Sequence, residues 1–368
     1  MKQHIVIDAR VRRSSTGRYA DQLVEHLQNI DHTNRYTILV QPGDDWHMRA
    51  GNFITVPCPF PQFSFNPLHE LRFAWQLYRL RPDLVHFTMT QQPLLYFGNI
   101  VTTTHDLIMF QFVRRGSTPV PVYWLKMRLY RFLIWWSHRK STRIIVPTKT
   151  IAKEVAAFQP STSNKLAVTY EDVGVPPKTK AEPVPGISGR FIMYMGNGFP
   201  HKNVSGLVAA FDILHKKYPD LTLLLGGKRE KNYIAVEEEA QSHPSIGKIV
   251  FTGFLPDAQA KWAFQHCEAF VLPSFMEGFG IPALEAMAQG APVVSSGTSV
   301  MPEVYGDAAL YFDPADPEDI ATKISEVLDN PQLRQKLKDA GKQQLKKYSW
   351  DKMARETLTV YKDTRLYT

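Results

Sequence analysis

The sequence predicts an α/β protein built from two doubly wound parallel sheets, each flanked by its own helices. Its 368 residues exceed what one ordinary core accommodates and suit two domains. Short apolar runs alternate with helical stretches, and several runs are nearly continuous in Val, Ile and Leu, as in parallel strands covered on both faces. A segment rich in Pro, Gly and charge, 178–190, divides these runs into two series and is typical of an interdomain linker.

The two series of apolar runs define the predicted strands of an N-terminal domain, residues 1–180, and a C-terminal domain, residues 186–348. The first series is HIVIDAR (4–10), YTILVQ (36–41), FITVP (53–57), LVHFT (84–88), NIVTTTH (99–105) and RIIVPT (143–148). The second is FIMYMG (191–196), LTLLLGG (221–227), KIVFTGF (248–254), AFVLPS (269–274), APVVSSG (291–297) and ALYFDP (309–314).

Helical periodicity places three helices next to candidate ligand-binding loops. Apolar residues recur on one face of 14–28 and of 201–218, and Asn203 is the predicted N-cap of the latter. The third helix, 282–290, has proline at its start and glycine at its end, the usual asymmetry of helix termini.

Composition limits the class of protein. The chain is 44% hydrophobic and 21% charged, as globular proteins are. Its two cysteines, Cys58 and Cys267, fall in different predicted domains, which excludes a disulfide scaffold and a structural zinc site. The N-terminal segment MKQHIVIDAR lacks the zones of a signal peptide, and no apolar run approaches the roughly 20 residues of a membrane span. We therefore expect a cytoplasmic protein.

The net charge of +8 suits phosphate-bearing small molecules, anionic membranes or nucleic acid. Neither zinc-ligand spacing nor an aromatic RNA-binding motif occurs, so nucleic acid is the least favoured partner and none is predicted.

The segment MYMGNGFPHKN (193–203) is the first candidate site. A predicted buried strand ends in Gly196-Asn197-Gly198, and a helix follows, so that backbone N–H groups and the positive helix end point outward. Lys202 adds a full charge there. Such a loop can hold a diphosphate and stabilise the charge that develops as it leaves. Alternatively it is an ordinary strand–helix connection with a solvated lysine, since glycine loops are common at such positions.

The segment EGFGIPALE (277–285) is the second candidate site. Gly278 and Gly280 let the backbone approach a ligand closely. Glu277 can accept hydrogen bonds from sugar hydroxyls, and Glu285 can accept them from a ribose. The structural alternative is that Glu285 merely stabilises the start of its helix, by ~0.3–1 kcal/mol.

With these motifs in view, the chain resembles the retaining glycosyltransferases of family 4, which have the GT-B fold. EGFGIPALE matches their Glu-x7-Glu motif, and VFTGFL, PHKN and GAPVVSSGTSVMPEVYGDAALYFDP match neighbouring motifs, over about residues 190–320. GRYADQLVEHL, LVHF, TTTHDL and RIIVPTKTIAKEV extend the resemblance more weakly into the first half. It implies two Rossmann-like domains facing across a cleft, with the acceptor on the first and the nucleotide sugar on the second. It also implies that the last helix, about 350–368, packs back on the first domain.

The resemblance assigns a role to each matched position. Lys202 would bind the donor diphosphate, Glu285 the ribose, and Glu277, with the backbone of the glycine turn, the donor sugar and diphosphate. His105, after a strand of the first domain, would face the reacting sugar carbon. The predicted catalytic residues are His105, Lys202 and Glu277; the predicted substrate-binding residues are Gly17, Asp106, Gly196, Asn197, His201, Gly253, Phe254, Leu255, Gly278, Phe279, Gly280 and Glu285.

Several features temper or extend this assignment. Many family members have an arginine beside or upstream of the lysine, whereas here His201 precedes Lys202 and the loop has none, so that Asn197 or His201 would contribute. A lone histidine such as His105 is often structural, and Asp106 can simply cap a helix.

Retaining members are thought to react on one sugar face without a side-chain nucleophile, so the paired-carboxylate scheme of hydrolases does not apply to the two glutamates. No Asp-x-Asp pair occurs, which predicts metal-independent transfer with no cofactor besides the donor, a GDP- or UDP-hexose.

The segment VYWLKMRLYRFLIWWSHRKSTR (122–143) alternates aromatic and aliphatic residues with lysine and arginine. Two interpretations remain open: a helix on an anionic membrane with its tryptophans at the headgroups, or a helix packed on the first sheet. Its apolar residues nearly encircle it, which favours burial. The proline- and aromatic-rich stretch 58–71 is either an acceptor-side loop or an ordered surface turn.

Two functions are compatible with these observations. The favoured one is a retaining hexosyltransferase, with a mild preference for mannose, acting on a glycan or lipid-linked acceptor. The alternative is a catalytically silent protein on the same fold that docks a nucleotide sugar, a membrane or a partner. A dinucleotide oxidoreductase is excluded, because GNGFPHKN lacks the G-x-G-x-x-G spacing.

Overall fold

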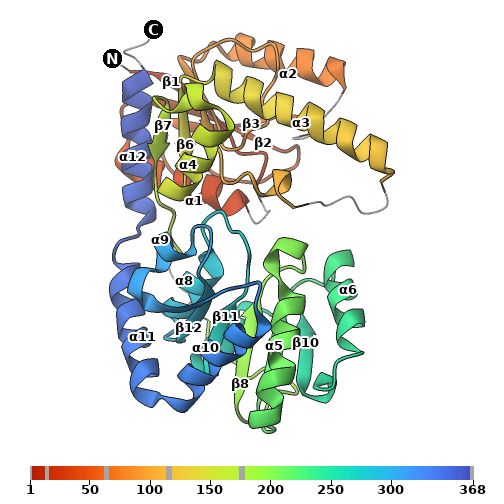
Figure 1. Ribbon diagram of the computed structural model, residues 1–368. Coiled ribbons are helices and arrows are strands. Elements are labelled where there is room, and N and C mark those ends of the chain that lie inside the picture. Colours follow the sequence, from red (N-terminus) through yellow and green to blue (C-terminus); the bar gives the residue numbers. More distant parts are fainter. Residues whose placement is uncertain (1, 13–15, 62–65, 113–117, 174–178, 365–368) are drawn as a thin grey trace. The chain divides into compact units, whose positions relative to one another are not determined.

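The computed structural model describes residues 2–12, 16–61, 66–112, 118–173 and 179–364 of the chain (Figure 1). It divides the chain into two compact units. Unit 1 comprises residues 1–171 and 349–368, and unit 2 comprises residues 172–348. The division falls at residue 172, ahead of the linker expected at 178–190.

Unit 1 contains a 7-stranded sheet in the order β3-β2-β1-β4-β5-β6-β7, and every neighbouring pair is parallel. Its strands are β1 (His4–Asp8), β2 (Arg35–Val40), β3 (Phe53–Pro57), β4 (Leu84–Phe87), β5 (Ile100–Thr103), β6 (Arg143–Val146) and β7 (Leu166–Val168). The six runs of the first series form β1 to β6. β7 was not predicted, because this strand of three partly exposed residues is too short to give a periodic signal.

The helices of unit 1 cover both faces of its sheet. They are α1 (Gly17–Ile30), α2 (Pro67–Leu80), α3 (Val120–Lys140), α4 (Lys149–Phe158) and α12 (Trp350–Asp363), with the short helices η1 (Ile108–Phe110) and η2 (Pro160–Thr162). In β1, Ile5 and Ile7 pack into a core with α1 and α12, whereas Val6 between them packs into a second core with α2. Because successive side chains of a strand point to opposite faces, both faces require apolar residues, and the strand is apolar throughout.

Unit 2 contains a 6-stranded parallel sheet in the order β10-β9-β8-β11-β12-β13. Its strands are β8 (Phe191–Met195), β9 (Thr222–Gly226), β10 (Ile249–Gly253), β11 (Ala269–Leu272), β12 (Val293–Ser296) and β13 (Ala309–Phe312). All six runs of the second series are strands. The sheet order reverses between β8 and β11, and at such a switch point the connections diverge to opposite faces and leave a crevice at the carboxyl ends of the strands.

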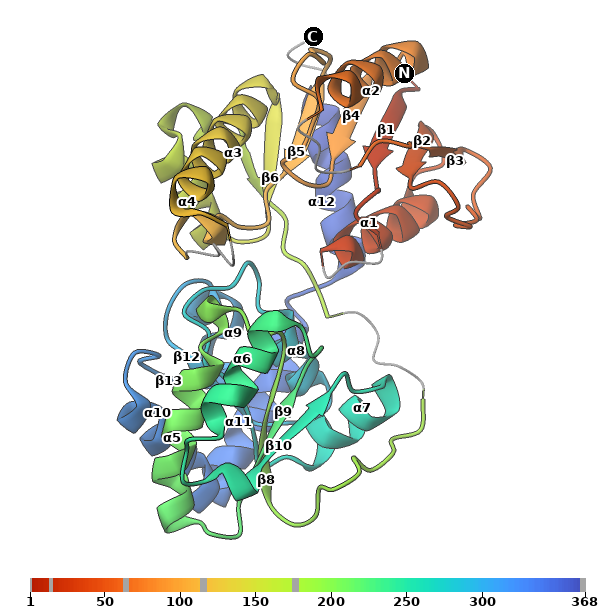
Figure 2. The ribbon, with the colours of Figure 1, turned by 90° about the vertical axis from the view of Figure 1, so that its right-hand side faces the viewer.

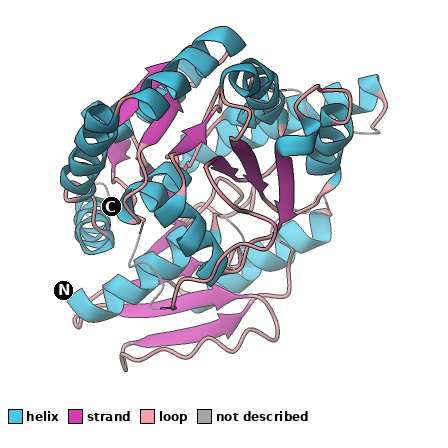
Figure 3. Ribbon diagram, turned by 90° about the horizontal axis from the view of Figure 1, so that it is seen from below, coloured by secondary structure: helices cyan, strands magenta, loops and turns pink. Residues whose placement is uncertain are grey.

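The helices of unit 2 flank its strands, as the helices of unit 1 do (Figure 3). They are α5 (Val204–Lys217), α6 (Lys231–Ala240), α7 (Asp257–His266), α8 (Ile281–Ala288), α9 (Met301–Tyr305), α10 (Pro317–Asp329) and α11 (Pro331–Leu345), with the short helices η3 (Pro200–Lys202), η4 (Ile246–Lys248) and η5 (Gly306–Ala308). The two doubly wound parallel sheets confirm the predicted fold class.

Asn203 occupies the predicted N-cap position of α5, but its side chain makes no capping hydrogen bond. It has a left-handed backbone, φ 53°, and its amide donates to the carbonyl of Pro314 at 2.7 Å. Burial of the basic aromatic helix, the favoured of the two interpretations, is limited to one side: Tyr123, Ile134, Ser137 and His138 of α3 are buried. The apolar residues that encircle α3 are largely exposed, because only one side of the helix contacts the rest of unit 1.

Candidate active site

The two candidate loops of unit 2 lie at the switch point of its sheet. The first joins β8 to α5 and includes η3, which ends at Lys202. The second joins β11 to α8 and carries Glu277. Because β8 and β11 are parallel neighbours, their following loops meet at one edge of the sheet. A backbone hydrogen bond of 2.8 Å from Phe275 N–H to the carbonyl of His201 ties the two loops together.

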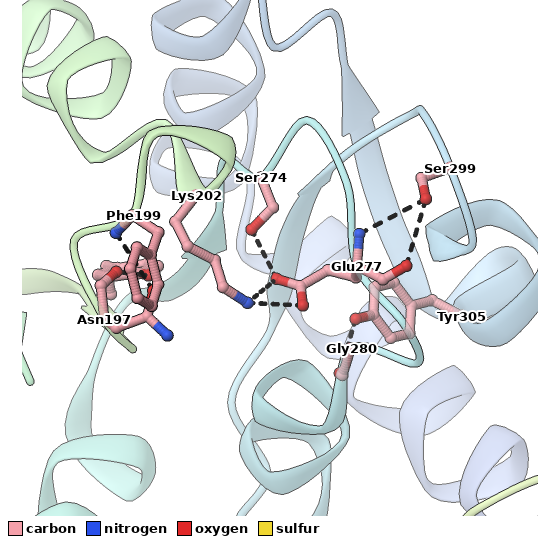
Figure 4. A network of polar contacts seen from close by, with 9 residues as sticks. Asn197, Phe199, Lys202, Ser274, Glu277, Gly280, Ser299 and Tyr305 are labelled. Carbon is pink, nitrogen blue, oxygen red and sulfur yellow. Dashed lines mark hydrogen bonds and ion pairs between the residues drawn. The ribbon is translucent and has the colours of Figure 1, made fainter. Parts of the chain in front are cut away.

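Lys202 and Glu277 form a close ion pair at this edge (Figure 4). Lys202 Nζ donates to both carboxylate oxygens of Glu277, at 2.7 Å each. The Ser274 hydroxyl donates to Glu277 Oε1, also at 2.7 Å. The side chains of Lys202 and Glu277 are only 14% and 7% exposed, so solvent screens the pair poorly. The structure thus brings two of the predicted catalytic residues into direct contact.

The backbone around Glu277 is held by Ser299 and Tyr305 (Figure 4). The Ser299 hydroxyl accepts from the Glu277 N–H and donates to its carbonyl, at 3.5 and 3.4 Å. The Tyr305 hydroxyl donates to the carbonyl of Gly280 at 2.7 Å. Burial, reinforced by the charge of Glu277, raises the pKa of Tyr305 well above its ordinary range, so this donor keeps its proton at physiological pH.

Gly280 is required by both conformation and space. Its φ is 83°, a left-handed value that disfavours side chains, and a Cβ there would lie 1.9 Å from the Tyr305 hydroxyl. It is the residue at the N-cap of α8, so the turn sets where that helix begins. The glycine pattern in EGFGIPALE therefore reflects a close approach of the loop to Tyr305.

The glycines after β8 are equally confined. A Cβ on Gly196 would lie 2.3 Å from the Tyr194 hydroxyl, and one on Gly198 would lie 2.6 Å from the backbone of Tyr233. The Tyr194 hydroxyl donates to the carbonyl of Asn197 at 2.8 Å, and the Asn197 side chain accepts from the N–H of Phe199 at 3.2 Å. The loop is thus packed into one shape before any ligand binds, as a preorganised anion site requires.

The remaining predicted residues of unit 2 differ in exposure. Asn197 is exposed, whereas the His201 ring is 3% exposed and stacks on Phe199 with centroids 5.9 Å apart. Glu285 is partly buried on α8. In the loop between β11 and α8, Gly278 is partly exposed. Phe279 is buried there against Tyr348, with ring centroids 5.5 Å apart.

The segment after β10 has a mixed environment. Gly253 has φ 69°, Phe254 is 67% exposed and Leu255 is buried. Arg229, which the sequence analysis did not single out, lies in the loop after β9, with its Cδ 4.0 Å from the position of a Gly253 Cβ. Its guanidinium pairs with Glu237 at 2.8 Å. An arginine is therefore present at this sheet edge although the loop of Lys202 has none.

In unit 1, His105 follows β5 and both its ring nitrogens face acceptors. Nδ1 lies 3.1 Å from Glu171 Oε1, and Nε2 lies 3.0 Å from the carbonyl of Thr88. Both nitrogens must carry protons to donate to these oxygens, which favours the imidazolium. Burial by itself lowers the pKa of His105, but the hydrogen bond and charge of Glu171 outweigh it, and the pKa is raised above 6.5.

The other two predicted residues of unit 1 have structural contacts. Asp106 accepts from the N–H of Ile108 at 3.0 Å, ahead of η1, as in an Asx turn. Gly17 begins α1, where a Cβ would lie 2.5 Å from the carbonyl of Val11. His105 and Asp106 also line a cavity of about 340 Å³ together with Tyr130.

A buried hydrogen-bonded chain next to His105 escaped the sequence analysis. His86 of β4 accepts from Tyr361 of α12 at 2.6 Å and lies 2.8 Å from the hydroxyl of Thr103, which in turn donates to Tyr19 at 3.1 Å. The Tyr19 ring packs edge-on against His105, with centroids 4.9 Å apart. Desolvation, and secondarily the charge of His105, lowers the pKa of His86 to about 3. The one available signal was a histidine within an apolar strand, LVHF.

Within the described parts of both units, no three His, Cys, Asp or Glu side chains gather as metal ligands would. None of the helices described combines the length and hydropathy that crossing a bilayer requires.

Comparison with known families matches both halves of the chain. Residues 178–344 match the model for "Glycosyl transferases group 1", and residues 16–171 match the model for "Glycosyltransferase Family 4". The first match lies entirely within unit 2 and the second entirely within unit 1.

Among curated relatives, the O-antigen chain mannosyltransferase B of Escherichia coli is 29% identical over 321 residues, 81% of this chain and 79% of its own. The O-antigen chain mannosyltransferase RfbU of Salmonella typhimurium is 26% identical over 266 residues, 68% of this chain and 72% of its own. The sulfoquinovosyl transferase SQD2 of Arabidopsis thaliana is 24% identical over 84% of this chain, which spans only 62% of SQD2.

Solved structures share the fold over the whole chain. A sucrose-phosphate synthase from Thermosynechococcus elongatus superposes with a TM-score of 0.76 at 17% identity, covering 100% of both chains. HepE of Anabaena, solved in complex with UDP and glucose, superposes with a TM-score of 0.71 at 13% identity, covering 98% of this chain and 100% of its own.

Proposed function

Because the chain belongs to the GT-B glycosyltransferases that combine a family 4 N-terminal half with a group 1 C-terminal half, we propose that it is a retaining hexosyltransferase. It would move a hexose, with mannose preferred, from a nucleotide sugar to a glycan or lipid-linked saccharide. The mannosyltransferase relatives support the choice of sugar. The observation that carries the proposal is the Lys202–Glu277 pair between preformed loops at the switch point of unit 2.

In this proposal the donor diphosphate lies over the loop after β8. Backbone N–H groups of that loop and the Lys202 ammonium would stabilise the negative charge that grows on the leaving phosphate. Glu277 fixes the direction of the ammonium, since both its oxygens accept from Nζ. On donor binding, one oxygen of Glu277 would accept from a sugar hydroxyl while the other keeps Lys202 in place. Glu285 would bind the ribose, and Arg229 would supply the cation that the first loop lacks.

The proposed reaction uses no side-chain nucleophile and no metal. The leaving phosphate would take the acceptor proton on the same face of the sugar. His105, held as an imidazolium by Glu171 and Thr88, would act by its charge rather than by proton transfer.

A panel of nucleotides and nucleotide sugars tests the proposal. GDP-mannose or a UDP-hexose should raise the unfolding temperature of the protein by mass action, and a mannoside acceptor should then be elongated with the anomeric configuration retained. Donor binding without transfer would instead support the silent binding protein. Product with inverted configuration would overturn the retaining assignment.

Lys202→Ala should lower turnover by about 10²–10³, the usual cost of losing one donor to a developing anion. The matched control is Lys217→Ala, which removes an exposed ion pair with Asp329 in the same unit and should leave turnover unchanged. Equal kinetics in Lys202→Ala and the native protein would remove the diphosphate assignment.

We further propose that α3 and α2 contact an anionic membrane, at the inner face of the cell membrane. Large apolar side chains of both helices are exposed, among them Trp75 at 60%, Trp124 at 54% and Leu125 at 69%. Exposed basic residues accompany them, and the sequence contains no Asp or Glu between Asp106 and Glu154. An exposed apolar face with cations, and on α3 without anions, is complementary to an anionic lipid surface.

Flotation with liposomes tests the membrane contact. The protein should float with vesicles that contain anionic lipid, less with neutral vesicles, and less at high salt. Leu125→Asp should weaken flotation several-fold. Ile213→Asp, at an exposed apolar residue of unit 2 that is 39% exposed, should not. Flotation that ignores both lipid charge and Leu125→Asp would contradict this contact.

A further inference from the structure

A second cavity of unit 1, of about 460 Å³, opens between α2 and α3. Its volume is in the range of ligand-binding pockets. Most of its wall is hydrocarbon, contributed by Leu71 and Phe73 of α2, Leu94 of the loop after β4, and Leu129, Leu133 and Ile134 of α3. We call it the α2–α3 cavity.

The α2–α3 cavity adjoins the cavity of His105, since Thr90 and Tyr130 line both. Polar groups gather at this junction. The Gln91 amide nitrogen donates to the Tyr130 hydroxyl at 2.9 Å. The side-chain carbonyl oxygens of Gln91 and Gln92 are buried and accept no hydrogen bond from any residue in the described ranges. A buried acceptor without a partner costs free energy and favours a ligand that supplies a donor.

Arg10 and Glu70, which line the α2–α3 cavity, both have partners within the protein. The Arg10 guanidinium pairs with Asp8 at 2.6 Å, donates to the carbonyl of Phe60 at 2.8 Å and lies over the Phe73 ring. Burial raises the pKa of Glu70, whose carboxylate accepts from the N–H of Leu94 at 3.3 Å. Among the described residues of the wall the one guanidinium is therefore paired and no lysine occurs, so an uncharged hydrocarbon chain fits them better than a phosphate does.

We propose that the α2–α3 cavity binds the apolar aglycone of the acceptor, so that the acceptor is a glycolipid whose sugar lies at the junction with the His105 cavity. This assignment rests on the proposed glycosyl transfer for the sugar part of the ligand. The carbonyl oxygens of Gln91 and Gln92, shielded from solvent in the free protein, would accept hydroxyl hydrogen bonds from that sugar once the two side chains rotate toward it. The aliphatic walls bury the first carbons of its lipid chain.

Alkyl mannosides with chains of six to nine carbons, used below micelle-forming concentrations without donor, test the inference by calorimetry. Affinity should rise with each added methylene, by at most about fourfold. Leu133→Trp, which fills the cavity, should abolish this dependence on chain length. Leu94→Trp fills it from the opposite wall and provides the same test if the first variant does not fold. Leu125→Trp is the matched control, because this exposed residue of α3 is not part of the cavity wall.

Two results would overturn the inference: affinity that does not depend on chain length, or a dependence that persists in both folded filling variants. The affinity for octanol measures the contribution of the hydrocarbon chain without the sugar. Octyl mannoside should bind at least tenfold more tightly than octanol, and Gln91→Leu should reduce that advantage. Equal binding of the two would mean that the cavity takes any membrane lipid and would overturn the glycolipid assignment. Donor binding, measured separately with GDP-mannose and with UDP-hexoses, reports on unit 2, so the absence of all of it would overturn the proposed function and leave the chain-length result standing.

Discussion

At the scale of residues, the functional groups are held by partners that sequence motifs do not reveal. Lys202 and Glu277 are 75 residues apart, yet both carboxylate oxygens contact the ammonium. His105 and Glu171 are 66 residues apart and meet at 3.1 Å. In each case one charge sets the orientation of the other, which reduces the reorganisation needed when substrate charge appears.

Glu171→Gln should lower the pKa of His105. Removing the carboxylate leaves burial as the dominant influence, and burial disfavours the imidazolium. Protonated His105 stabilises the folded chain. This contribution is fully present below pH 6.5, the ordinary pKa of histidine, and is lost as the pH rises through the raised pKa of His105. In Glu171→Gln, where burial dominates, protonation of His105 should no longer stabilise the folded chain.

Titration of isotope-labelled histidine by NMR measures the change. Glu326→Gln, at a partly buried residue of unit 2, serves as the control and should leave the His105 titration where it is in the native protein. A titration curve that is identical in Glu171→Gln would show that Glu171 does not control the protonation of His105.

At the scale of elements, two loops of unit 2 are shaped by tyrosines rather than by ligands. The hydroxyls of Tyr194 and Tyr305 each donate to a loop carbonyl and leave no room for a side chain at Gly196 and Gly280. The loops are therefore formed before the donor arrives, and the cost of ordering them is not taken from the binding free energy.

Gly280→Ala should destabilise unit 2 by about 1–3 kcal/mol and weaken nucleotide binding. Its Cβ would collide with the Tyr305 hydroxyl in addition to requiring a left-handed backbone. Thermal unfolding and a nucleotide titration measure the two effects. Gly247→Ala is the control, since a Cβ at Gly247 meets nothing within 4 Å.

The double variant Gly280→Ala with Tyr305→Phe separates the two causes. It should recover part of the lost stability, because the colliding hydroxyl is gone while the backbone strain and the lost hydrogen bond remain. A double variant that is less stable than both single variants would contradict the proposed collision.

At the scale of the whole molecule, unit 1 is completed by the C-terminal end of the chain. Trp350, Met353 and Tyr361 of α12 belong to the same core as β1 and α1 (Figures 1 and 2). Tyr361 also donates to His86 at 2.6 Å, 275 residues away in sequence. The polar centre of unit 1 therefore forms only when both ends of the chain are in place.

The stability of unit 1 should fall as pH drops from about 6.5 towards 4. Burial lowers the pKa of His86 to about 3 and that of His138 to about 4. Between these values and 6.5, both histidines stay neutral in the folded chain, whereas the same histidines take up protons in the unfolded chain. The stability that the protein has above pH 6.5 is therefore lost progressively on acidification. Each such histidine contributes a slope of ~1.4 kcal/mol per pH unit.

His138→Gln isolates one of these contributions. The variant should be less stable than the native protein at pH 7, and the deficit should shrink by about 2 kcal/mol at pH 5, because the variant lacks the histidine that penalises acid. Hydrogen exchange of β5 amides, corrected for the intrinsic rate at each pH, reports the free energy of opening. A deficit that is equal at both pH values would contradict a neutral, buried His138.

The sequence alone determined the fold class, twelve of the thirteen strands and the positions of the loops that carry Lys202 and Glu277. It could do so because both faces of a parallel strand are buried, which leaves an unbroken apolar run, and because a left-handed turn against a tyrosine requires glycine. These constraints act on neighbouring residues and so appear as local patterns.

Only the tertiary structure decided the ion pairs, the exposure of α3, the α2–α3 cavity and the contact of Asn203 with Pro314. Each depends on which distant element lies opposite a side chain, and local periodicity contains no such information. The apolar ring of α3 shows the difference most clearly: its composition is that of a core helix, but packing covers one side of it and leaves its tryptophans available to another surface.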